Sequence, residues 1–151
     1  MRKLLKENGE IERRYGIKYK TIKNNKMNIQ SFSFSTPAGY KWLLRQGLIN
    51  FEIDSPLLPW YYLKKEDTFF TNKHWPETPS KYTLFVFARR QDNDDLACFK
   101  VENNIAKEIV LIHGWTSEGY SIVHIYATFW DWLKSVIDDM ALIVEMENED
   151  Q

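Results

Sequence analysis

The sequence predicts an α+β domain with a single, mainly antiparallel or mixed sheet, helices packed on it, and a closing C-terminal helix. Two observations predict this class. Runs of strand length that are rich in β-branched and aromatic residues cluster in the middle of the chain, and helical patterns lie near both ends. A length of 151 residues is typical of one domain with a real core. We therefore treat residues 1–151 as a single domain.

The central element is a predicted β-hairpin. Its first arm, Thr83 to Ala88, and its second arm, Leu96 to Val101, are apolar, and a polar, charged segment separates them. Asp and Asn tolerate turn conformations, and their side chains can bond nearby backbone amides. The hairpin tip is therefore placed at Gln91 to Asp94.

Two elements are expected before the proline-rich region. Thr36-Pro37 is a favourable helix start, because a hydroxyl cap precedes a proline at the first helical position. The helix is predicted over Ala38 to Gln46, with Gly47 as its stop. The alternation in Leu48 to Ile53 then predicts a strand.

Prolines at 56 and 59 interrupt the chain before a short strand, Trp60 to Leu63. The interval from Lys64 to Ser80 is predicted to be a long loop. It is unusually apolar for a loop, since it contains Phe69, Phe70, His74 and Trp75. Two alternatives stay open: the segment folds over the core, or it offers a binding edge.

The elements after the hairpin are two strands joined by a turn. Glu108 to His113 is β-branched in character, Gly114 to Gly119 is a turn that contains Trp115, and Tyr120 to Tyr126 is extended. These segments are expected to extend the hairpin into a larger sheet.

The main helix is expected to begin after Thr128, whose hydroxyl can cap it, with Asp131 three residues on. Its buried face is predicted from helical spacing, and Trp130 and Trp132 are placed at the flanks of that face. The predicted face consists of Phe129, Leu133, Val136, Ile137, Met140 and Val144. The acidic tail, 146–151, is expected to be frayed.

Charge is distributed unevenly along the chain. Residues 1–30 hold nine Lys or Arg and three Glu, about +6, whereas residues 91–151 hold three Lys and thirteen acidic residues, about −10. The basic head, 1–28, is expected to be weakly ordered. Only Tyr15 and Tyr19 accompany its basic residues, so stacking on single-stranded nucleic acid would be thin. A solvated surface explains both charge runs more simply than a nucleic-acid partner.

Cys98 is the only cysteine, so an intramolecular disulfide and a zinc site built on thiolates are excluded. It lies among apolar strand residues, where a free Cys behaves as a small hydrophobe. The longest apolar runs fall short of the roughly 18–20 residues that a membrane span needs. Nothing at the start resembles a signal peptide. A cytoplasmic protein with no membrane partner is expected; its oligomeric state stays open.

The hairpin tip is the strongest candidate site. Asp92, Asp94 and Asp95 lack the spacing, glycine and distant Glu of a calcium loop, and Arg89 and Arg90 would repel a cation. No metal and no cofactor are predicted there. A turn with its own hydrogen bonds and a local ion pair is the first interpretation, and a charged site for a protein partner is the second.

Three tryptophans extend the predicted partner site. Trp60, Trp75 and Trp115 lie in a loop or beside turns, where a ring need not be wholly buried. Large aromatic residues at such positions are plausible anchors for a protein partner, with the surrounding charges contributing selectivity.

A catalytic alternative rests on two histidines. His113 and His124 could meet across neighbouring strands, with Glu118 or Glu108 near them, as a general acid–base pair. No nucleophile beside them has a recognisable context, and Ser117 and Ser121 are ordinary turn residues. We therefore predict that the protein is not an enzyme and assign no catalytic residue. A small hydrolase or nuclease that uses the two histidines is the alternative from this class.

Three segments resemble the SUKH superfamily, which includes bacterial immunity proteins and the yeast cell-wall glucan-synthesis regulator. The strand Asp95-Leu96-Ala97-Cys98-Phe99 and the helix start Phe129-Trp130-Asp131-Trp132-Leu133 resemble characteristic family segments, and residues 11–17 resemble the opening helix and glycine. The likeness covers roughly residues 81–140. Residues 18–21 depart from the family, which has a proline after the opening glycine.

The resemblance implies a mixed α+β fold and, in bacteria, neutralisation of a secreted toxin by direct binding. The expected partner is then a cognate protein toxin, and the acidic C-terminal half would suit a basic nuclease. A general interaction or regulatory module of the same fold is the second expectation.

Overall fold

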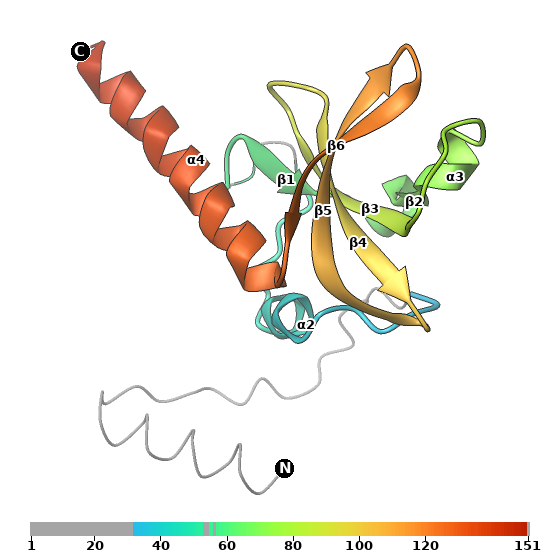
Figure 1. The fold of residues 1–151 in the computed structure, drawn as a ribbon. Coiled ribbons are helices and arrows are strands. Elements are labelled where there is room, and N and C mark those ends of the chain that lie inside the picture. The colour runs from blue at the N-terminus through green and yellow to red at the C-terminus, as the bar shows by residue number, and fades with distance from the viewer. Residues whose placement is uncertain (1–31, 53–54, 56, 151) are drawn as a thin grey trace, which may run out of the picture.

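The computed structural model describes residues 32–52, 55 and 57–150, and its centre is one antiparallel sheet (Figure 1). Four strands form a meander in which β3 pairs β4, β4 pairs β5 and β5 pairs β6; β1 and β2 both pair with β3. The strands are β1 (Trp60–Tyr62), β2 (Phe69–Phe70), β3 (Thr83–Arg90), β4 (Asp95–Glu102), β5 (Ile105–Thr116) and β6 (Gly119–Tyr126). Together with the helices, this confirms the α+β class.

The predicted hairpin is β3 and β4, and its turn spans residues 91–94 as expected. The Asn93 side chain accepts a hydrogen bond from the Asp95 amide at 2.8 Å, so the turn supplies its own bonds. The following hairpin, β4–β5, turns at Asn103 and Asn104, which have φ values of 49° and 60°. Two left-handed residues match the strand twist of a tight hairpin, and the sequence prediction passed over this signal.

Helix α2 (Ala38–Arg45) lies where it was predicted, but its start differs. Pro37 is the N-cap residue, no side chain caps the helix, and the predicted cap by Thr36 is therefore wrong. Thr36 is one position too early, and it is buried. Gly47, at φ 68°, follows the helix, and the Leu48 amide bonds the Leu43 carbonyl at 2.9 Å.

The strand predicted over Leu48 to Ile53 is wrong for its described part, residues 48–52, which contain no strand. After the turn at Gly47, the Asn50 side chain accepts a hydrogen bond from the Glu52 amide at 2.9 Å. Such a local side-chain bond competes with pairing in a sheet. Ile53 lies outside the described residues.

The interval from Lys64 to Ser80 is not a structureless loop. It contains the short helices η1 (Lys65–Asp67) and α3 (Thr71–His74), with β2 between them. Phe70 packs against the core on one face of the sheet, and Phe69 and Trp75 pack against the core on the other. Of the two alternatives for this segment, folding over the core is confirmed.

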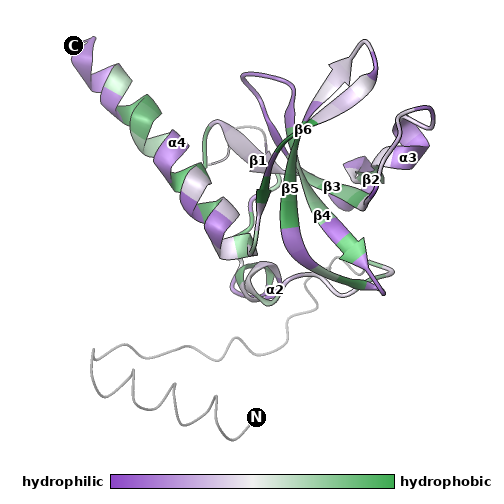
Figure 2. Ribbon diagram, viewed as in Figure 1, coloured by the Kyte–Doolittle hydropathy of each residue, from purple (hydrophilic) through white to green (hydrophobic). Residues whose placement is uncertain are grey.

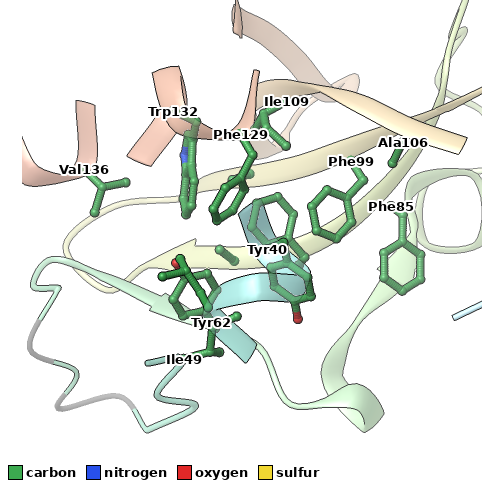
Figure 3. Packing of buried hydrophobic residues seen from close by; sticks show 14 of the residues in the cluster. Tyr40, Ile49, Tyr62, Phe85, Phe99, Ala106, Ile109, Phe129, Trp132 and Val136 are labelled. Atoms are coloured by element: carbon green, nitrogen blue, oxygen red, sulfur yellow. The ribbon is translucent and has the colours of Figure 1, made fainter. Parts of the chain in front are cut away.

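The first core lies between the sheet and helices α2 and α4 (Phe129–Glu149). Figure 3 shows Tyr40 of α2 and Phe129 and Trp132 of α4 gathered over side chains of the sheet. The Phe87 and Phe99 rings stack at 3.9 Å between centroids, directly beneath these helices. Most of the described aromatic side chains therefore lie in this layer.

The second core lies on the opposite face of the sheet, where Phe69 and Trp75 of the segment containing β2 and α3 pack against it. It contains Leu84, Val86, Leu96, Cys98, Val110, Ile112 and Tyr120. Cys98 is completely buried, as its apolar context predicted, and burial raises the pKa of its thiol. Figure 2 shows that the centre of the sheet is its most hydrophobic part.

Helix α4 begins as predicted, with the Thr128 hydroxyl accepting a bond from the Asp131 amide at 3.1 Å. Its buried face differs from the prediction, because Trp132 is at its centre whereas Ile137 and Val144 are exposed. Leu133 and Met140 are half-buried. The contact face follows Phe129, Trp132 and Val136, which lie three and four residues apart. Ile137 is about 100° from Val136 around the axis.

The C-terminal half of α4 extends away from the sheet (Figure 1). The helix continues to Glu149, so residues 146–149 are helical where the sequence predicted fraying. The basic head, 1–28, and the last residue of the acidic tail lie outside the described residues. Within the described part of the chain, no helix is long and apolar enough to cross a membrane.

Candidate functional site

The candidate site, here called the tip site, comprises Arg89, Asp94 and Trp115 with His74 and Trp75 of the α3 segment. Trp115 is its centre. A bulge between His113 and Thr116 interrupts the pairing of β5 with β6, and Trp115 has φ 52° within it. A bulky residue rarely adopts this left-handed conformation. The bulge turns the Trp115 ring outward, leaving the residue 43% exposed.

Side chains from two segments, β3 and the α3 segment, contact the Trp115 ring. The guanidinium carbon of Arg89 lies 4.6 Å from the ring centroid, in a cation–π contact worth about 0.5–1 kcal/mol at an exposed position. Trp75 meets the ring edge-on at 5.4 Å between centroids, and His74 does so at 5.9 Å. The Asp94 carboxylate lies 3.8 Å from the Arg89 guanidinium. The site is therefore held in place before any partner arrives.

Hydrogen bonds to backbone carbonyls hold these segments together. The Gly114 amide donates to the Asp94 carbonyl at 2.9 Å, which ties β5 to the hairpin tip. The Thr78 hydroxyl donates to the Glu118 carbonyl at 2.7 Å, tying the α3 segment to the β5–β6 turn. Gly119, at φ 104°, allows this approach, since an added Cβ would collide with the Thr78 hydroxyl.

A groove of about 390 Å³ lies beside Trp115 on the same face of the sheet. Its size is near the lower end for small-molecule pockets, and it fits one or two side chains of a protein. Arg89 and Lys64 supply positive charge, and Glu52 and Asp67 supply negative charge. Its lining consists of Phe51, Glu52, Tyr61, Tyr62, Leu63, Lys64, Asp67, Phe69, Arg89, Leu96 and Trp115.

Arg90 and Asp92, also predicted to bind a partner, stabilise the fold on the other face of the sheet. Arg90 bonds Asp92 through two parallel hydrogen bonds of 2.8 and 2.7 Å. It also lies 3.2 Å from the carboxylate of Asp139 in α4. The hydrogen bond from Arg90 lowers the pKa of Asp92, and the bond to Asp92 raises the pKa of Arg90. The local ion pair predicted at this turn is confirmed.

Trp60 is not a surface anchor, and this prediction is wrong. It is 3% exposed, its indole N–H donates to Asp139 at 3.2 Å, and its ring meets Trp132 edge-on at 5.5 Å. Pairing of β1 with β3 points this ring toward α4. The prolines before Trp60 indicated a turn at the surface, but the strand that follows them lies in the core.

The two histidines of the catalytic alternative have different neighbours. The His113 ring lies 2.8 Å from the carboxylate of Asp95, which is opposite it in the β4–β5 register, whereas the His124 ring packs on Tyr126 at 4.5 Å. Ser121 is opposite His113 on β6, and no hydrogen bond joins their side chains. The Asp95–His113 pair has the composition of a general base with its orienting carboxylate. Within the described ranges, no cluster of His, Cys, Asp and Glu is placed to hold a metal ion.

The structure thus brings together four of the eight residues predicted to bind a partner: Arg89, Asp94, Trp75 and Trp115. Arg90, Asp92 and Trp60 belong to the packing beneath α4, and Asp95 pairs with His113. Sequence reasoning did not assign His74 to the site. Its position beside Trp75 in an aromatic-rich segment was the available signal.

A scan against protein-family models found no match to the chain, and neither the curated proteins nor the solved structures gave one. The resemblance to the SUKH superfamily therefore stays a prediction from the quoted residues.

Proposed function

We propose that the protein is a non-catalytic binding module that recognises another protein through the tip site. The observation that carries this proposal is the Trp115 ring, turned outward by a left-handed residue and braced by Arg89 and Trp75. A strained conformation of a bulky residue persists only where the surroundings enforce it, and such positions cluster at functional sites. This favours a role for the outward ring over chance exposure.

The surroundings of Trp115 match the known anatomy of binding hot spots. Trp and Arg are the residues most enriched among hot spots, and a central aromatic ring within a charged rim is typical of them. Because Arg89 and Trp75 already fix the ring, a partner would immobilise few further rotamers on binding. The groove beside Trp115 can receive a side chain of the partner, and its mixed charges can reject wrong partners.

The narrower proposal is that the partner is a cognate, secreted bacterial toxin that the protein neutralises by direct binding. This rests on the SUKH resemblance at residues 95–99 and 129–133. The acidic balance of residues 91–151 supports a basic toxin such as a nuclease. Under this proposal the protein acts in the cytoplasm, with no cofactor and no nucleic acid as its own ligand.

Affinity capture from the protein's own cells, with nuclease treatment and at low and high salt, tests the proposal. The variants to compare are Trp115→Gly and Trp130→Ala, because Trp130 on α4 is equally exposed, at 45% against 43%, and lies outside the tip site. We expect one protein partner that Trp130→Ala retains and Trp115→Gly loses. Recovery of nucleic acid alone, lost at high salt, would contradict protein binding.

Co-expression of the captured partner then tests toxin neutralisation. A partner that stops growth, with growth restored by the wild-type chain and not by Trp115→Gly, supports it. A partner that is harmless when expressed alone indicates the general interaction module instead.

One observation favours a second candidate function, a small hydrolase. The Asp95–His113 pair at 2.8 Å leaves the other ring nitrogen of His113 for a proton transfer, and Ser121 is opposite it. A hydrolytic activity that disappears in His113→Ala, with the fold intact and partner capture unchanged, would establish this function. His124, packed on Tyr126, is the matched control for it.

A further inference from the structure

Strand β6 is the long free edge of the described sheet. It is the last strand in the order β1-β3-β4-β5-β6 and pairs on one side only, with β5 (Figure 1). The strand at the opposite end, β1, has three residues and directly follows Pro59. A short edge beside a proline is poorly suited to pairing with another chain, whereas an eight-residue edge is well suited to it.

The β6 edge lacks the usual protection against association. Gly119 to Ala127 contains no Asp, Glu, Lys or Arg and no proline. Its β-branched side chains are exposed, with Ile122 at 45%, Val123 at 53% and Ile125 at 38%. Native edge strands usually carry charges, prolines or bulges that prevent pairing. The devices present are two irregularities in the pairing with β5, an extra residue at Val123 and the bulge in β5 between His113 and Thr116.

The irregularity at Val123 changes which side chains share a face. Ile122 is opposite Ile112 and Ile125 is opposite Val110, so Val123 is an extra residue in the β6 strand. Ile112 and Val110 are two apart and lie in the same core, on one face of the sheet. Ile122 and Ile125 therefore also share a face, and their backbone groups have the same orientation relative to β5.

We infer that β6 pairs with β6 of a second copy of this chain in an antiparallel, two-fold symmetric dimer. In the register with Ile122 opposite Ile125 of the second copy, symmetry places Ile125 opposite Ile122 of the second copy. The four isoleucines then form one cluster, two from each copy, on one face of a continuous sheet. The extra residue at Val123 is what makes this register possible, because without it residues 122 and 125 would lie on opposite faces.

The self-complementary register is the reason to choose a second copy as the occupant. A strand that pairs with itself brings each charge near its own copy, and β6 has no charge to bring. Two-fold dimers, in which the same patch serves both subunits, are the commonest oligomers. This dimer leaves the tip site free, since Trp115 and Arg89 are not on β6.

The oligomeric mass of the full chain in solution, measured by light scattering or sedimentation, tests the inference. We expect twice the 18.1 kDa of one chain at micromolar concentrations. Ile122→Lys and Ile125→Lys are expected to shift the mass to that of the monomer. Leu142→Lys, at an exposed apolar position on α4 far from β6 in the sequence, is the matched control and should stay dimeric. Circular dichroism confirms that each variant is folded.

Cysteine cross-linking tests the register. Ile122→Cys and Ile125→Cys are expected to form a disulfide only when the two variants are mixed and not when each is alone, because each position faces the other. The native Cys98 is completely buried and will not interfere. A monomeric wild type would overturn the inference. Dissociation by Leu142→Lys, or cross-linking within either variant alone, would overturn the pairing described here.

Discussion

Trp115 and Trp60 are the same residue type in opposite roles. Trp115 is 43% exposed in the tip site, whereas Trp60 is 3% exposed in the first core. Both rings lie near an arginine of β3, Trp115 at 4.6 Å from Arg89 and Trp60 at 5.9 Å from Arg90. Arg89 and Arg90 are neighbours in a strand, so their side chains point to opposite faces of the sheet. On one face Arg90 lies 3.2 Å from Asp139 of α4, and on the other Arg89 belongs to the tip site. The adjacent arginines thus serve the core and the tip site separately.

Substitution of these two tryptophans should separate stability from binding. Trp60→Ala removes a buried ring and its hydrogen bond to Asp139, so we expect the free energy of unfolding to fall by about 3–5 kcal/mol. Trp115→Gly loses ring contacts but removes a left-handed strain of about 1–2 kcal/mol, so its net change should be within about 1 kcal/mol. Urea unfolding of both variants measures the difference. A large loss of stability in Trp115→Gly would show that the ring is structural.

Helix α4 contacts the sheet through fewer residues than the spacing of its apolar residues predicts. Trp132 is fully buried and contacts the rings of Trp60, Tyr62 and Phe87, whereas Ile137, five residues later, is exposed. The close approach of α2 to this stripe requires Gly39, because a Cβ there would lie 2.8 Å from both Phe129 and Trp130. The N-terminal half of α4 is therefore packed against α2 and the sheet, and its C-terminal half extends away from the sheet.

The position of the contact stripe gives a second stability prediction. Trp132→Ala should lower the free energy of unfolding by about 3–5 kcal/mol, because it empties the centre of the first core. Ile137→Ala should change it by less than about 0.5 kcal/mol, since the side chain is exposed and Ala is the better helix former. Thermal or urea unfolding measures both. Equal losses of stability in the two variants would show that Ile137 belongs to the buried face, as the sequence predicted.

The helices and strands of the molecule were easier to predict from the sequence than the tip site. Local chemistry specified the β3–β4 turn through Asn93 and the α4 cap through Thr128, and both formed as expected. The strand predicted after Gly47 failed because Asn50 offers its own backbone bond instead. Trp60 was wrongly predicted to lie at the surface. Which side chains of a short strand are buried depends on its partner strand and on α4, and the periodicity of three residues cannot predict this.

The tip site depended still more on long-range structure. Arg89 and Trp115 are in contact only because β4 lies between β3 and β5 and a bulge in β5 rotates the ring. No local pattern in the sequence marks a bulge at Trp115, since Gly114 and Thr116 are compatible with the turn that was predicted. What sequence could provide was the residue types suited to a binding surface.

Arg90 connects the hairpin tip, α4 and β1, through Asp92 and through Asp139, which also accepts from Trp60. The pKa of Asp92 is lowered by its hydrogen bond from Arg90. A carboxyl with a lowered folded-state pKa contributes stability above its unfolded value, about 3.9. That contribution disappears as the pH falls through the folded-state pKa. Acidification should therefore loosen this connection specifically.

Comparison of the wild type with Asp92→Asn across pH isolates this effect. At pH 7 we expect the variant to be less stable by about 0.5–1 kcal/mol, a modest value because the Asp92 side chain is 45% exposed. The difference should shrink toward zero as the pH falls through the lowered folded-state pKa of Asp92, because the wild-type carboxyl then becomes neutral as well. Asp138→Asn is the control, because Asp138 is exposed and makes no ion pair with any residue that the structure describes. Urea titrations at several pH values measure both variants, and a difference that persists in acid would show that Asp92 acts through shape and not through charge.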